Sequence, residues 1–158
     1  MIDFMVIALP RSGTAWVSNL LTTDDSVCVH EALISYTLAE LDALSVPHML
    51  GIAETSGAYI ADEINQHSAR KLVITRPIAE INNSAIRLGF ESLSDDANLL
   101  LDKVDGYKIE YKNLFDYKEM SKAYEYLCGK HLDPLRHALL CDLRIENIAA
   151  IDAVRSMV

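Results

Sequence analysis

Two short apolar runs without alternation stand out along the chain, at Phe4–Leu9 and Lys71–Thr75. Unbroken runs of bulky and β-branched residues are typical of strands that are buried on both faces of a parallel sheet. Turn residues and then a helical pattern follow each run, at Thr14–Leu21 after the first and at Ile78–Leu88, closed by Gly89, after the second. This repeated order predicts an α/β fold, a three-layer α/β/α sandwich with a central parallel sheet.

Weaker patterns complete the predicted architecture. Two further strands are expected at Ser26–His30 and Gly106–Tyr111. Further helices are expected at Tyr36–Leu44, Ala58–His67 and Asp116–Leu127, and over most of residues 133–158. No linker-like stretch interrupts these elements, so we expect residues 1–158 to form a single domain.

Charge and cysteine content narrow the functional classes. Lys and Arg total 14 against 23 Asp and Glu, which gives a net charge of -9. Nucleic-acid coats and binders of anionic membranes need a basic face, so we expect neither partner. The three cysteines are widely separated and form no Cys/His cluster, so we expect no metal site and a reducing, cytoplasmic location. The first apolar run is too short for a signal peptide or a membrane span.

The segment Leu9–Trp16 joins the first predicted strand to a helix. Backbone amides at such a helix N-terminus point outward and, together with the helix dipole, attract anions. Ser12 and Gly13 are small enough for the backbone to wrap an oxyanion, and Arg11 adds a charge that can donate to two oxygens. We therefore expect an anion site in this loop.

The loop departs from the phosphate-binding pattern GxxxxGK[ST] of kinases and ATPases. When the pattern is aligned on Gly13, its other diagnostic positions are occupied by Ala8, Thr14 and Ala15. The lysine is therefore missing, and so is the hydroxyl that would hold magnesium. This difference argues against a metal-dependent kinase or ATPase.

The sequence PRSGTAW at Pro10–Trp16 resembles the 5′-phosphosulfate-binding loop of sulfotransferases, P-[KR]-S-G-[TS]-T-W, with alanine in place of the second threonine. The resemblance implies a P-loop nucleotide-binding fold and 3′-phosphoadenosine 5′-phosphosulfate as the sulfuryl donor, used without a metal. It also implies that the tryptophan lies against the adenine. The residues that would bind the donor here are Arg11, Ser12, Gly13, Thr14, Ala15 and Trp16.

Two later segments extend the resemblance. Arg76 and Ser84 keep the family's R-x7-S spacing, and in sulfotransferases this pair grips the 3′-phosphate. Lys108–Gly129 resembles the family's strand and helix that end in glycine, which implies that Tyr111 borders the adenine pocket. With these matches in order over most of its length, the chain is identified as a short bacterial or phage-like member of the sulfotransferase family.

Transfer of a sulfuryl group needs a base that removes the acceptor's proton. The strand that follows the loop's helix ends in His30 and Glu31. Glu31 is the first choice, because small bacterial relatives place a glutamate just after this strand, and His30 is the alternative. On the leaving-group side, Arg11, the loop amides and the Thr14 hydroxyl would stabilise the growing charge.

The predicted function is transfer of a sulfuryl group to a hydroxyl or amine of a small-molecule or glycan acceptor. A chain of 158 residues leaves little room for an acceptor pocket, so the pocket is either open or completed by another subunit of a homo-oligomer. The family's C-terminal Arg-Lys-Gly segment is absent after Gly129, where Arg136 and Arg144 are the candidate substitutes. The alternatives are a non-catalytic nucleotide-binding module and, less favoured, a kinase-like nucleotide enzyme.

Overall fold

The computed structural model describes residues 1–143, and within them five strands form one sheet in the order β2-β3-β1-β4-β5. Every pair of neighbouring strands is parallel. The prediction of an α/β fold around a parallel sheet is confirmed. The strands are β1 (Phe4–Ala8), β2 (Ser26–His30), β3 (Met49–Glu54), β4 (Arg70–Thr75) and β5 (Tyr107–Glu110).

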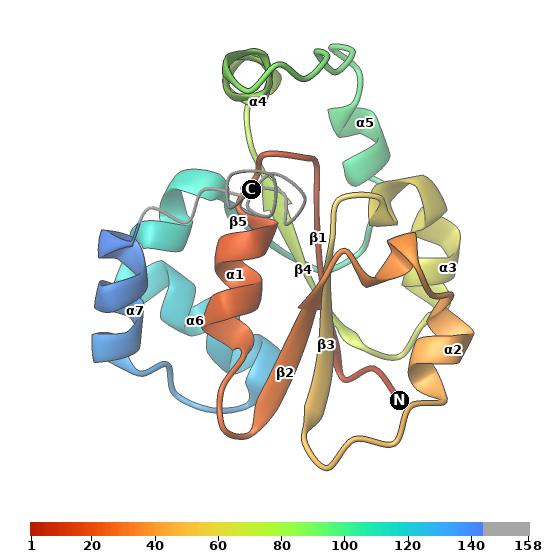
Figure 1. Ribbon diagram of the computed structural model, residues 1–158, viewed down its shortest axis with the longest axis vertical. Coiled ribbons are helices and arrows are strands. Elements are labelled where there is room, and N and C mark those ends of the chain that lie inside the picture. The colour runs from red at the N-terminus through yellow and green to blue at the C-terminus, as the bar shows by residue number, and fades with distance from the viewer. Residues whose placement is uncertain (144–158) are drawn as a thin grey trace, which may run out of the picture.

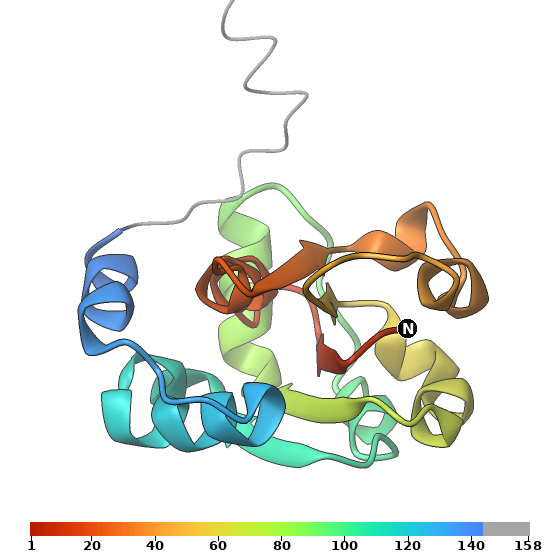
Figure 2. The same cartoon turned by 90° about the horizontal axis from the view of Figure 1, so that it is seen from below.

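Helices cover both faces of the sheet (Figures 1 and 2). One layer contains α1 (Thr14–Leu21), α6 (Tyr117–Cys128) and α7 (Pro134–Asp142). The opposite layer contains α2 (Leu38–Asp42), α3 (Ala61–Gln66) and α5 (Asn98–Leu101). The helix α4 (Ile78–Arg87) lies beyond the carboxyl ends of the strands (Figure 1), and its Ile81 packs into the core of the second layer. Short 3-10 turns complete the fold: η1 (Ala32–Ile34), η2 (Gly57–Ile60) and η3 (Tyr111–Phe115).

The central strand β1 explains why its sequence lacks alternation. All five of its residues are buried. Phe4 and Val6 pack into the core beneath α1 and α6, whereas Met5 and Ile7 pack into the core on the other face. A strand between two apolar layers needs apolar side chains at every position. Because β1 is buried up to its last residue, Ala8, its packing also fixes where the following loop begins.

The sequence did not reveal β3. Gly51 interrupts its apolar run, and glycine is a poor strand residue. The structure shows why glycine stands there: a Cβ at this position would lie 1.9 Å from Cε2 of Phe4 in the neighbouring strand. The aromatic ring crosses the space that a side chain would fill, which is a common reason for a glycine inside a strand.

The predicted helices are confirmed with shifted ends. The region predicted as Tyr36–Leu44 forms the shorter α2, and the region predicted as Ala58–His67 begins as η2 before it becomes α3. In the C-terminal stretch predicted to be helical, α7 covers Pro134–Asp142, and residues 144–158 lie outside the described part.

Candidate functional site

The candidate site lies at the carboxyl ends of the strands, where Arg11 and Glu31 follow β1 and β2. Both residues adopt left-handed backbone conformations, with φ of 64° and 56°. Among residues 1–143 they are the only non-glycine residues with positive φ. Each such conformation costs about 1–2 kcal/mol, and backbone strain of this kind is concentrated at functional sites. The two strained positions are also two of the positions that the sequence predicted to be catalytic.

The loop between β1 and α1 is tightly packed. Ser12 is fully buried, and its hydroxyl has no hydrogen-bond partner within the protein. Gly13 has a φ of 87°, and a Cβ there would lie 2.9 Å from Cδ1 of Leu114 and 3.2 Å from Cε2 of Tyr111. An unpaired buried hydroxyl costs about 1–3 kcal/mol. An oxyanion bound in the loop would provide the acceptor that the Ser12 hydroxyl lacks.

The two anion-binding regions predicted from sequence, the loop with Arg11 and the pair Arg76 and Ser84, lie close together in the structure. Arg11 donates from Nε to Oγ of Ser84 over 3.2 Å, although the two residues are 73 positions apart. Arg76 donates from Nη1 to the backbone carbonyl of Arg11. Its Nε also donates to Oε2 of Glu80 over 3.3 Å. The loop and the first turns of α4 therefore form one polar network.

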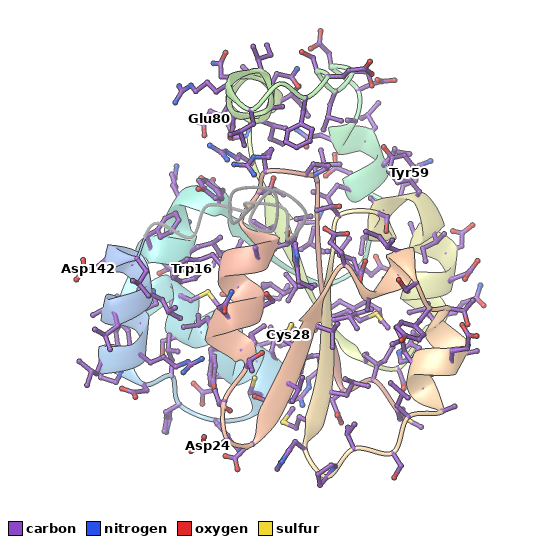
Figure 3. The ribbon with its side chains drawn as sticks, viewed as in Figure 1. Trp16, Asp24, Cys28, Tyr59, Glu80 and Asp142 are labelled. Carbon is purple, nitrogen blue, oxygen red and sulfur yellow. The ribbon has the colours of Figure 1, made fainter. Side chains whose placement is uncertain are left out.

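Tyr111 lies against this network. The guanidinium carbon of Arg76 is 3.9 Å from the centroid of the Tyr111 ring, which is a cation-π contact. Both residues line a cavity of about 340 Å³, within the size range of small-ligand pockets. Glu80 on α4 borders the same cavity, beyond the ends of the strands (Figure 3). The full lining is Thr75, Arg76, Pro77, Glu80, Asn98, Glu110, Tyr111 and Lys112.

The other side of the loop faces β2. A hydrogen bond of 3.0 Å joins Oγ1 of Thr14 to Nε2 of His30. The same imidazole nitrogen lies 3.6 Å from Oε1 of Glu31, whose Oε2 accepts a bond of 3.4 Å from the amide of Thr55. Burial lowers the pKa of His30, and the Glu31 carboxylate opposes this effect. The imidazole is therefore neutral near pH 7 and able to accept a proton.

A buried carboxyl that sequence reasoning missed lies beside this pair. Glu54 ends β3 and is fully buried. Its Oε1 accepts a bond of 3.1 Å from the amide of Leu33, and its Oε2 has no partner. Burial raises the pKa of Glu54 to about 7; the hydrogen bond from the Leu33 amide opposes this rise, and the charge of Glu31 adds to it. The sequence does place an acidic residue directly after the apolar run Leu50–Ala53, which would have marked Glu54 as a residue at a strand end. Glu54 was not identified because β3 itself was not predicted.

Trp16 lies in the interior, between α1 and α7 (Figure 3). Only 6% of the residue is exposed, and its Nε1 donates to the carbonyl of Leu140 over 2.9 Å. Its ring also makes edge contacts with Phe115 and His137. The structure thus gives Trp16 a packing role and does not bring it to the network around Arg76. Its contact with adenine stays a prediction.

Two other predicted residues have structural partners. The carbonyl of Ala15 accepts hydrogen bonds from Ser18 Oγ and Asn19 Nδ2, both within the first turns of α1. Arg136 donates to the backbone carbonyls of Asn19, Leu20 and Thr22. The guanidinium therefore caps the C-terminal end of α1, away from the loop at its start. Arg144, the other candidate substitute for the missing C-terminal segment, lies outside the described residues.

Across residues 1–143, no three His, Cys, Asp or Glu side chains are grouped as a metal site requires. No helix in the same range has the length and apolar character needed to cross a membrane. Comparison of the chain with protein-family models, with curated proteins and with solved structures gives no significant match.

Proposed function

We propose that this chain is a sulfotransferase that moves a sulfuryl group from 3′-phosphoadenosine 5′-phosphosulfate to a hydroxyl or amine of a small-molecule or glycan acceptor. One observation carries the proposal. Arg11, Ser84, Arg76 and Tyr111 meet at the strained loop after β1, beside a cavity of about 340 Å³. The resemblance to sulfotransferases assigns Arg11 to the phosphosulfate, Arg76 and Ser84 to the 3′-phosphate, and Tyr111 to the adenine pocket of one donor.

The loop supplies the groups that the phosphosulfate end requires. Arg11 contributes a permanent positive charge, and the buried hydroxyl of Ser12 has an unused hydrogen bond to donate. The amides at the start of α1 add the positive end of the helix dipole. These groups favour an anion without requiring a magnesium ion, in keeping with the absence of a hydroxyl at Ala15.

The opposite end of the donor carries a 3′-phosphate, for which Arg76 and Ser84 are the proposed ligands. Ser84 already contacts a guanidinium, that of Arg11, and Arg76 has a half-buried side chain beside Tyr111. A bound 3′-phosphate would accept hydrogen bonds from the Arg76 guanidinium and from the Ser84 hydroxyl. In the adjoining cavity, the carboxylates of Glu80 and Glu110 are suited to accept hydrogen bonds from an adenine amine or ribose hydroxyls.

In the proposed reaction, an acceptor oxygen or nitrogen forms a bond to sulfur while the bond from sulfur to the phosphate oxygen breaks. The acceptor's proton passes to Glu31, the first-choice base, or to His30, the alternative. Negative charge grows on the departing phosphate, where Arg11 and the loop amides stabilise it. The base side and the leaving-group side are linked through the hydrogen bond between Thr14 and His30.

Turnover separates this proposal from its alternatives. The protein is supplied with the phosphosulfate donor, EDTA and a panel of hydroxyl and amine acceptors, and release of 3′-phosphoadenosine 5′-phosphate is measured. Release that requires both an acceptor and an intact Glu31 supports the sulfotransferase. Binding without release with any acceptor supports the non-catalytic nucleotide-binding module. Transfer from ATP that requires magnesium supports the kinase-like enzyme and contradicts the proposal.

A further inference from the structure

Glu54 is the only fully buried carboxyl among residues 1–143. Burial of a carboxyl group is costly when it lacks a charged partner, and an apolar residue of similar size would avoid that cost. No basic side chain contacts this carboxyl, and one of its oxygens has no hydrogen-bond partner at all. A group that costs stability at the edge of a candidate site calls for a functional explanation.

The position of Glu54 ties it to the turn that carries Glu31. In the parallel register, Glu54 is opposite Ile7, just before the loop begins. Its Oε1 holds the amide of Leu33 at 3.1 Å, two residues after Glu31. The residues on either side of Glu54 also bind Glu31: the Ala53 carbonyl accepts from the Glu31 amide, and the Thr55 amide donates to the Glu31 carboxylate.

Three consecutive residues, Ala53, Glu54 and Thr55, therefore hold the strained turn by hydrogen bonds. Glu31 has a φ of 56°, a conformation that persists only where the surroundings impose it. The bonds from residues 53 and 55 hold Glu31 directly, and the bond from Glu54 holds the next turn of backbone. Two side chains take part in this set, the carboxyls of Glu31 and Glu54, and Glu54 is the one that holds the turn from the neighbouring strand.

We propose that Glu54 is a positioning residue: its carboxyl holds the amide of Leu33 and, through it, the 31–34 turn that carries Glu31, so that loss of this bond loosens the turn and slows turnover. The consequence for turnover rests on the proposed function, whereas the coupling between Glu54 and the turn does not.

The surroundings of Glu54 favour its protonated form. The titratable groups that act on it are Glu31, before η1, and Cys28 on β2. The carboxylate of Glu31 repels a second negative charge, and burial raises the pKa of the Cys28 thiol so far that it stays neutral. On the same face, Ile7 is apolar, and η2 contributes no acidic or basic residue. With a pKa of about 7, Glu54 would change its charge within the physiological range.

The structural half of the proposal is tested without any ligand. The amide resonance of Leu33 is followed by NMR from pH 5 to pH 9 in the unmodified protein, in Glu54→Gln and in Glu63→Gln. Glu63 is an exposed carboxylate on α3 and serves as the matched control. We expect a titration with a midpoint near pH 7 that persists in Glu63→Gln and is lost in Glu54→Gln. A flat Leu33 resonance, or a titration that survives in Glu54→Gln, would overturn the proposal.

The functional half is tested by the turnover of two variants. Glutamine keeps an acceptor for Leu33, so Glu54→Gln should keep kcat within about twofold of the unmodified protein. Leucine removes the acceptor, so Glu54→Leu should lose at least tenfold in kcat with little change in the affinity for 3′-phosphoadenosine 5′-phosphate. A tenfold or greater loss of kcat in Glu54→Gln would contradict this half, whether or not Glu54→Leu folds. If the unmodified protein shows no turnover, the proposed function fails, while the Leu33 titration still decides the role of Glu54.

Discussion

The two sides of the loop after β1 differ in their side chains: arginines and a serine meet on one side, and glutamates and a histidine on the other. On the side of β4 and α4, the side chains of Arg11, Arg76 and Ser84 bind one another across long sequence separations. On the side of β2 and β3, the carboxyl of Glu31 lies beside His30, and the charge of Glu31 acts in turn on the buried carboxyl of Glu54. The first side is suited to hold anions and the second to take up protons. A group-transfer site needs both, and β1 stands between them.

The largest expected effect distinguishes the two sides by kinetics. Glu31→Gln should reduce turnover by about 10²–10⁴-fold, the usual size for a lost general base, and should leave nucleotide affinity nearly unchanged. Arg11→Ala should lower both affinity and turnover, because in the proposed reaction Arg11 would contact the donor and stabilise the charge that grows on the leaving group. Rates with saturating donor and affinities from calorimetry measure both effects.

His30 provides the control for this assignment. If Glu31→Gln keeps the full rate and His30→Asn loses it, the base is His30 and the first choice is wrong. If both variants keep the full rate, neither residue is the base, and the division of the site into an anion side and a proton side fails.

The next largest effect concerns stability on the acidic side. The pKa of Glu54 is about 7 in the folded protein, above the ordinary value of 4.5 expected when the chain unfolds. Between these values the folded state keeps a proton that the unfolded state has released, so stability falls as the pH rises through this window and levels off above it. The loss is on the order of 3 kcal/mol.

Glu54→Gln removes this titration. Its free energy of unfolding, measured in urea at pH 5 and at pH 8, should therefore fall less between the two pH values than that of the unmodified protein. Glu63→Gln, an exposed change on α3, should behave like the unmodified protein. Equal pH dependence in all three proteins would show that Glu54 does not titrate in this window.

A smaller effect is expected on the basic side. Arg76→Ala should erase the preference for a nucleotide with a 3′-phosphate, which we expect to be worth about 1.5–3 kcal/mol, or about tenfold or more in affinity. Weak binding of the adenosine part should remain. Arg87→Ala removes an exposed arginine at the end of α4, the helix that follows Arg76, and should keep the preference. Loss of the preference in both variants would indicate a general charge effect.

The smallest expected effect is that of chelation. Ala15 lacks the hydroxyl that would anchor a magnesium nucleotide, and arginines provide the positive charge on the anion side. Turnover should therefore be the same with EDTA as with magnesium. Activity that disappears on chelation and returns with magnesium would favour a kinase-like enzyme.

Local patterns predicted the parts of the fold that depend on burial alone. The unbroken apolar runs identified β1 and β4, because both strands are buried on two faces. They failed for β3, where Gly51 makes room for the ring of Phe4, a contact between strands that no local pattern records. Because β3 was not predicted, Glu54 at its end was not identified as a candidate site residue.

Sequence motifs selected several residues that lie close together in the structure, but they did not give the geometry in which those residues meet. The loop residues, Arg76 and Tyr111 were identified from motifs, and the structure brings them together. The bond from Arg11 to Ser84 joins residues on different elements, so its geometry depends on the fold. For Trp16, the motif predicts a contact with adenine, and the structure shows its ring packed against α7. Its contact with adenine stays a prediction.

The central claim is that this chain recognises a nucleotide carrying both a 5′-phosphate group and a 3′-phosphate. Its most direct test is calorimetric titration of the unmodified protein, without magnesium, with 3′-phosphoadenosine 5′-phosphate and separately with ADP. The account predicts that the 3′-phosphorylated nucleotide binds about tenfold or more tightly, because Arg76 and Ser84 gain charge-assisted hydrogen bonds to the extra phosphate. Equal affinity for the two nucleotides, or no binding of either, would contradict it.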